Sequence, residues 1–120
     1  MTDDELRDEL LRRLRVDREV RDPVHASEPG WADRWAAVDE DNTVWLMSVV
    51  SSQGWPLLSQ VGEDAARAAW LLAQHADAAP ELQRHFRAAM ADAAAHGEAR
   101  ARHLASLEDR VRVNALRRRP

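Results

Sequence analysis

Apolar side chains recur every three or four positions along most of the 120-residue chain, which is the spacing of helices that bury one face. No stretch alternates apolar and polar residues as a half-buried strand does. Glycine and proline divide the pattern into segments, and those predicted to be helical are residues 2–20, 30–52, 62–76, 80–97 and 99–116. We therefore expect an all-α fold, a single compact bundle of about five helices over residues 1–120. Its ends are an N-terminal helix within 1–21 and a basic tail at 114–120.

The segment 62–76 differs from the others because it is apolar almost all round, which predicts a helix in the middle of the domain. Its end is polar: Trp70, Gln74 and Asp77 share one stripe, and His75 lies beside it. From spacing alone, Asp77 is expected to cap the following helix, and His75 is expected to lie in the core with its hydrogen bonds satisfied there. The alternative pairs His75 with Asp77 beyond the helix end, where a carboxylate can orient an imidazole that exchanges protons.

Two other predicted helices carry polar residues on their apolar stripes. The leucine stripe of the first helix runs into Asp17 and Arg21, and spacing favours a solvent-exposed, salt-bridged helix end there. Asn42 interrupts the stripe of the second helix, which begins with Trp31 and Trp35. A buried asparagine needs hydrogen-bond partners, so Asn42 is either tied to neighbouring backbone or lines a polar pocket.

The composition narrows the class of protein. A net charge of −4 argues against general nucleic-acid binding, and the lack of cysteine excludes disulfides and thiolate metal sites. No apolar run approaches the ~18 residues of a membrane-spanning helix, and the charged start lacks the apolar core of a secretory signal. These features predict a cytoplasmic protein with no membrane partner. The five tryptophans indicate a large core, a pocket or an interface.

Metal binding and nucleophilic catalysis have little support in the residue pattern. None of the five histidines forms the four-residue-spaced pair of a helical zinc site. A metal shared by His75 and Asp17 has no support from spacing, so no metal and no cofactor is predicted. The basic residues Arg110, Arg112 and 117–119 could attract a phosphate or carboxylate, although a solvated tail is the simpler interpretation of the last three.

Several strings together resemble the bacterial domain-of-unknown-function family 6624. They are NTVWL at residues 42–46, QGWP at 53–56, VGEDAARAAWLLAQHAD at 61–77 and LASLEDRVRVN at 104–114. The resemblance extends from about residue 17 to residue 114. Relatives usually continue after the last of these helices into a further segment, whereas this chain reads NALRRRP.

The resemblance names no activity, but it implies a set of polar positions. The residues of this chain that fall on them are Asp17, Arg21, Asn42, Gln74, His75, Asp109 and Arg110. Asp77 matches them less closely. If these side chains from separate helices converge, they form a polar site inside a tryptophan-rich helical core.

Two functions are compatible with such a site. The first is a small enzyme that acts on a small molecule or peptide. Its expected catalytic residues are His75, as general acid–base, with Asp109 and Arg110, and its expected ligand-binding residues are Asp17, Arg21, Asn42, Trp70 and Gln74. The second is a non-catalytic interaction or regulatory module, in which the polar cluster fixes helix packing and exposed tryptophans meet a partner or form a homodimer.

Overall fold

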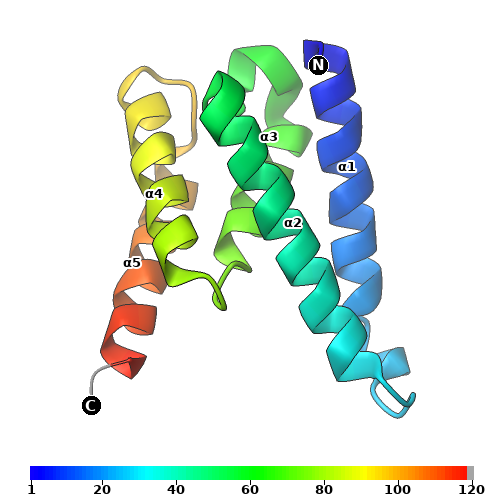
Figure 1. Cartoon of the computed structure of the whole chain (residues 1–120). Coiled ribbons are helices and arrows are strands. Elements are labelled where there is room, and N and C mark those ends of the chain that lie inside the picture. The colour runs from blue at the N-terminus through cyan, green and yellow to red at the C-terminus, as the bar shows by residue number, and fades with distance from the viewer. Residues whose placement is uncertain (119–120) are drawn as a thin grey trace.

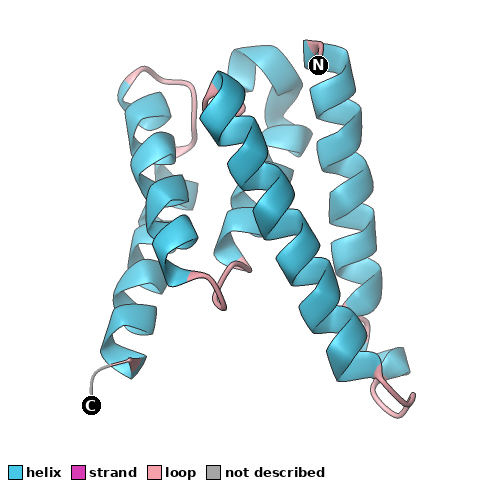
Figure 2. Ribbon diagram, in the orientation of Figure 1, coloured by secondary structure: helices cyan, strands magenta, loops and turns pink. Residues whose placement is uncertain are grey.

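A computed structural model describes residues 1–118 and confirms the all-α prediction (Figure 1). Its five α-helices are α1 (Asp3–Val20), α2 (Trp31–Gln53), α3 (Leu58–Gln74), α4 (Pro80–Ala95) and α5 (Ala101–Arg117). One short 3-10 helix, η1 (Pro23–His25), follows α1. Helices and connecting loops account for all of the described chain, with no strand among residues 1–118 (Figure 2).

Helix α3 lies at the centre of the bundle, as its apolar composition predicts, and it contacts each of the other four helices. Four of its alanines are among the best buried residues of the core, and small side chains allow the neighbouring helices to approach closely. Near its start the backbone breaks at Gly62, whose φ of 81° and ψ of 171° suit only glycine. The main body of α3 therefore begins at the position that the sequence predicts, after one extra turn over 58–61.

Residues that favour helix starts occupy the starts of α1 and α4. Thr2 and Glu5 form a capping box at the start of α1, and Pro80 occupies the first turn of α4. Trp55, in the loop between α2 and α3, is 4% exposed and fills the core from the loop. The tryptophans at the start of α2, Trp31 and Trp35, are both partly exposed.

The connection between α1 and α2 is held by aromatic contacts. The Trp31 indole Nε1 donates a hydrogen bond to the Val20 carbonyl oxygen at 2.7 Å. Trp31 meets Trp35 edge to face, with ring centroids 5.0 Å apart, and the Arg21 guanidinium lies 4.9 Å from the centroid of a Trp35 ring. These contacts place the last residues of α1 beside the first half of α2.

The helices diverge at one end of the molecule. In Figure 1, α1 and α2 extend downwards on the right and α4 and α5 on the left, while the α3–α4 connection ends between them. The lower half of α2 thus stands apart from the start of α4 and the end of α5. Side chains from both halves and from the α3–α4 connection line a cleft there.

The predicted start of the basic tail at residue 114 is wrong, because the last helix continues beyond it. Helix α5 continues to Arg117, and Asn114 is buried within it at 4% exposure. Arg118 donates hydrogen bonds to the carbonyl oxygens of Asn114 and Asp77. Residues 119–120 of the predicted tail lie outside the described residues. No helix in the described part of the chain has both the length and the apolar character to cross a membrane.

Candidate functional site

His75 is paired with Asp17, a residue 58 positions earlier in the chain. His75 follows the last turn of α3, where its backbone N–H donates to the Leu71 carbonyl, and its ring Nδ1 lies 3.0 Å from Asp17 Oδ1. Asp17 is only 2% exposed, whereas the His75 side chain is 21% exposed. The solvent-exposed helix end predicted for Asp17 is therefore wrong: the leucine stripe of α1 carries this carboxylate into the protein.

Arg21 holds the same carboxylate from the other side and extends the group to α2. Its Nη1 donates a short hydrogen bond to Asp17 Oδ1, one helical turn away, and its Nη2 donates to Asp39 Oδ2 at 2.9 Å. Asp39 Oδ1 is also 2.9 Å from Arg21, within ion-pair distance, but it is buried and receives no directed hydrogen bond. We refer to Asp17, Arg21, Asp39 and His75 as the His75 cluster.

The His75 cluster forms one side of the cleft between the diverging helices, which has a volume of about 840 Å³. This volume is within the range of small-molecule sites. Its polar lining includes Arg21, Asp39, Glu40, His75, Asp77 and Arg110. Its apolar lining includes Trp35, Val44, Leu82 and the alanines of the α3–α4 connection.

Asp77 forms the opposite polar side of the cleft and is fully engaged with α4 and α5. It accepts two hydrogen bonds from Arg110, from Nε at 2.9 Å and Nη2 at 2.6 Å, and one from Asn114 Nδ2 at 2.7 Å. Gln83, which is 1% exposed, donates to Asp77 and to the Ala73 carbonyl at the end of α3. We call Asp77, Gln83, Arg110 and Asn114 the Asp77 network. It fixes the α3–α4 connection to α5.

Neither predicted role of Asp77 is found. The residue before α4 is Ala79, which makes no side-chain cap, so Asp77 does not cap that helix. His75 is paired with Asp17 instead of Asp77. The helix break that follows α3 turns the two side chains towards different neighbours.

Burial and hydrogen bonding act differently on the carboxylates of the two groups. Desolvation raises the pKa of Asp39 and outweighs the opposing effects of its hydrogen bond and charge interaction with Arg21. Desolvation is also the largest single influence on Asp77, yet hydrogen bonds from Arg110, Asn114 and Gln83 together lower its pKa to about 2. The hydrogen bond to Asp77 raises the pKa of Arg110 in turn. Asp77 is thus a fully satisfied carboxylate, whereas Asp39 has a hydrogen bond from Arg21 to Oδ2 alone.

Asn42 and Asp109 do not line the cleft. Asn42 is 4% exposed and accepts a hydrogen bond from Arg13 Nη1 at 3.0 Å in a separate small pocket between α1 and α2. Asp109 points to solvent, where its side chain is 69% exposed and lies 3.6 Å from Arg112. Arg110 is the next residue, but a step of one residue on a helix turns the side chain to another face.

Trp70 and Gln74 also lie away from the cleft, against α5. The Trp70 ring stacks on His103, with centroids 4.2 Å apart and an interplanar angle of 6°. Desolvation and neighbouring arginines lower the pKa of His103, which favours a neutral ring in this stack. Gln74 Nε2 donates to Ser106 Oγ at 3.1 Å. Of the eight predicted site residues, Arg21, His75 and Arg110 line the cleft, and Asp17 lies buried behind His75.

Three residues of these two groups do not appear among the sequence-based candidates. Asp39 follows Trp35 by one helical turn, and this spacing signals a polar residue on the partly buried face. Asn114 follows Arg110 by one turn on the same face of α5. Gln83 has no comparable signal, because a single glutamine near a helix start reads as a surface residue.

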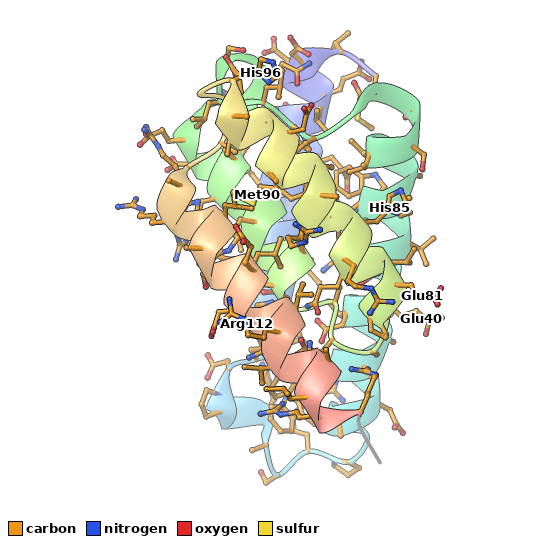
Figure 3. All side chains as sticks on the ribbon, turned by 90° about the vertical axis from the view of Figure 1, so that its left-hand side faces the viewer. Glu40, Glu81, His85, Met90, His96 and Arg112 are labelled. Carbon is orange, nitrogen blue, oxygen red and sulfur yellow. The ribbon has the colours of Figure 1, made fainter. Side chains whose placement is uncertain are left out.

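Asp17, Asp39 and His75 each offer one ligand atom within 4.8 Å of the others, the arrangement of a candidate metal site. Two carboxylates and an imidazole suit several divalent metals. The Arg21 guanidinium, however, already lies between the two carboxylates and neutralises part of their charge. A metal ion there would have to displace Arg21. Two other histidines, His85 in α4 and His96 at its C-terminal end, are exposed (Figure 3) and do not belong to this group.

Fold and site together define an all-α bundle with a cleft between a histidine–carboxylate cluster and an arginine–carboxylate network. Comparisons with family models, curated proteins and solved structures found no match to this chain. The resemblance to family 6624 stays a prediction. The function is therefore argued from the cleft itself.

Proposed function

We propose that the cleft binds a small molecule or peptide and that His75 exchanges a proton with it. The observation that carries the proposal is the contact between His75 Nδ1 and the buried Asp17 carboxylate, on a histidine that lines the cleft. A buried carboxylate behind a partly exposed imidazole is the usual arrangement of a general base and its orienting group. The same arrangement serves a binding site in which His75 accepts a hydrogen bond without catalysis.

The proton positions follow from the hydrogen-bonding capacities of the groups. An ionised carboxylate only accepts hydrogen bonds, so the Nδ1 of a neutral His75 carries the proton that is donated to Asp17. Nε2 then has a free lone pair and is the ring nitrogen available to a ligand in the cleft. When Nε2 takes a proton, Asp17 stabilises the resulting imidazolium, and Arg21 keeps Asp17 in place.

The other charged residues of the cleft have supporting roles in this proposal. Arg110 is held by Asp77 through two hydrogen bonds, so it shapes the wall of the cleft and does not act as a free catalytic cation. Trp35 and Leu82 supply apolar surface on opposite sides of the cleft. A bacterial source and a cytoplasmic location, which the sequence predicts, are part of this proposal.

Filling the cleft is expected to abolish binding without unfolding the protein. Ala36 is exposed and lines the cleft, so Ala36→Trp places an indole in it without disturbing the core. In ligand-observed NMR screening of a fragment library, fragments that bind the natural protein should bind Ala36→Trp at least about tenfold more weakly, a change of ~1.4 kcal/mol. Ala105→Trp, on an exposed position of α5 outside the cleft, is the matched control and should bind as the natural protein does.

Two results would count against the proposal. The first is a library without any binder, and the second is a set of binders that Ala36→Trp and Ala105→Trp affect equally. Fragments whose binding shifts the imidazole NMR signals of His75 would support the proposed role of that residue.

The second candidate function, a non-catalytic interaction or regulatory module, is favoured by the Asp77 network. In that network the Arg110 guanidinium is hydrogen-bonded to Asp77, which attaches α5 to the α3–α4 connection. This is a structural role. Under this alternative the His75 cluster likewise fixes α1 to α2 and α3. His75→Gln would then lower stability strongly while no fragment binds in the cleft. A homodimer stays a prediction under either function.

A further inference from the structure

The charges around the cleft do not balance. The carboxylates that line or lie directly behind it are Asp17, Asp39, Glu40 and Asp77. Two guanidinium groups line the cleft, those of Arg21 and Arg110, and that of Arg118 lies against the Asp77 carbonyl. With His75 neutral, the cleft therefore has an excess of one negative charge. Low-dielectric walls concentrate such an excess and attract cations.

The first part of the excess lies in the depth of the cleft. Arg21 is shared by two carboxylates, Asp17 and Asp39, so one guanidinium serves two negative charges. The Asp39 carboxylate lines the cleft with its side chain 20% exposed, and its Oδ1 receives no directed hydrogen bond. One ring nitrogen of His75 and one carboxylate oxygen of Asp39 lie within 4.8 Å of each other. A positively charged donor at the exposed part of the Asp39 carboxylate, beside His75, would balance the charge that Arg21 leaves.

The second part of the excess lies at the rim. Glu40 is exposed, lines the cleft and forms no ion pair with any residue among 1–118. Figure 3 shows Glu40 on α2 pointing outward on the same side of the molecule as Glu81 on α4. Glu40 is therefore positioned to attract a cation towards the cleft and not to bind it in the depth.

The remaining lining is apolar. Trp35 and Leu82 face the cleft, and Val44 exposes 61% of its surface there. The Trp35 ring already accepts one cation, the Arg21 guanidinium, on its face. A ligand of matching chemistry has a positive, hydrogen-bond-donating group next to an apolar body.

We propose that the ligand of the cleft is an organic amine in its protonated form, with its ammonium group at the Asp39 carboxylate beside His75 and its apolar body against Trp35. This inference rests on the proposed function, since it names the ligand class of that same cleft. An anionic ligand fits less well, because Arg21 and Arg110 are already engaged by carboxylates. A divalent metal would have to displace Arg21, whereas an amine adds to the exposed part of the Asp39 carboxylate and leaves the ion pair with Arg21 intact.

The test uses three probes of similar size that differ in one group: 2-phenylethylamine, 2-phenylethanol and 3-phenylpropionate. Binding is followed through the Trp35 indole and His75 ring signals in ¹H–¹⁵N NMR spectra near neutral pH. The amine should bind at least about tenfold more tightly than the alcohol, because only the amine makes a hydrogen bond between charged groups. The carboxylate should not bind.

Variants locate the ammonium group. Asp39→Asn should weaken amine binding about tenfold or more and leave the alcohol unchanged. If that variant fails to fold, Glu40→Gln provides an independent test. It should bind the amine about two- to fourfold more weakly than the natural protein does, and added salt should reduce this difference. Glu81→Gln, an exposed carboxylate on the same side but outside the cleft lining, is the matched control.

The outcomes separate this inference from the proposed function. Tighter binding of the alcohol or the carboxylate overturns the amine assignment while the cleft stays a binding site. Zinc that displaces the amine and perturbs Asp17, Asp39 and His75 together assigns the cluster to a metal and also overturns it. Binding of none of the probes or library fragments overturns both proposals.

Discussion

Replacing Asp17 by alanine is expected to lower the free energy of unfolding by about 3 kcal/mol, at the lower end of the range for breaking a buried charge pair. Asp17 is 2% exposed, and its Oδ1 accepts from both Arg21 and His75. Alanine leaves these two donors facing a cavity. Asp17→Asn should cost less, because the amide oxygen can take the place of Oδ1 for both donors but lacks the charge.

Urea unfolding followed by circular dichroism measures this loss. Glu19→Gln, an exposed carboxylate in the last turn of the same helix, is the control and should change stability by no more than about 0.5 kcal/mol. If Asp17→Ala unfolds at the same urea concentration as Glu19→Gln, the carboxylate is not held as the structure has it.

Replacing Asp77 is expected to have the second-largest effect and to change the pH dependence of stability. Asp77→Ala removes the acceptor of Arg110 and Asn114 and one acceptor of Gln83, which should cost about 2 kcal/mol. The side chain is 38% exposed, so solvent screening reduces the part that is due to charge to about 1 kcal/mol.

The direction of the pH effect follows from the lowered pKa. Hydrogen bonding lowers the pKa of Asp77 from its ordinary 3.8 to about 2, so the folded protein binds this proton less readily than the unfolded chain does. The contribution of Asp77 is therefore complete above about pH 4 and is lost as the pH falls towards 2. Asp77→Asn should remove that part of the acid sensitivity, as seen in unfolding curves between pH 2 and 6, whereas the exposed Asp64→Asn should not. If the free energy of unfolding falls equally steeply with decreasing pH in the natural protein and in Asp77→Asn, the Asp77 network is contradicted.

The helices could be predicted because their signals are local. Capping residues, glycines and the period of apolar residues act within one or two turns, and the central position of α3 follows from its composition alone. The partial exposure of Trp31 and Trp35 could not be predicted from the same local signals. These residues lie where the helices diverge, and helix periodicity does not encode the angle between helices.

The site could be predicted only in part because its contacts join distant segments. His75 stands out in the sequence as the polar end of a buried helix, but its partner Asp17 is 58 residues away. Neighbours in the sequence also separated: Arg110 lines the cleft while Asp109 points to solvent. Asn42 interrupts an apolar stripe as a site residue would, but its amide oxygen accepts a hydrogen bond from Arg13 on α1 and its Nδ2 has no partner among the described residues.

The pairing of His75 with Asp17 is tested most directly by the protonation of the His75 ring. Two-bond ¹H–¹⁵N correlation spectra of the histidine rings, recorded at a pH where His75 is neutral, distinguish the nitrogen that carries the proton. We expect the proton on Nδ1, facing Asp17, and a shift of that population towards Nε2 in Asp17→Ala, with the exposed His85 as internal reference. A neutral His75 with its proton on Nε2 in the natural protein would contradict the pairing and the proposed proton exchange with it.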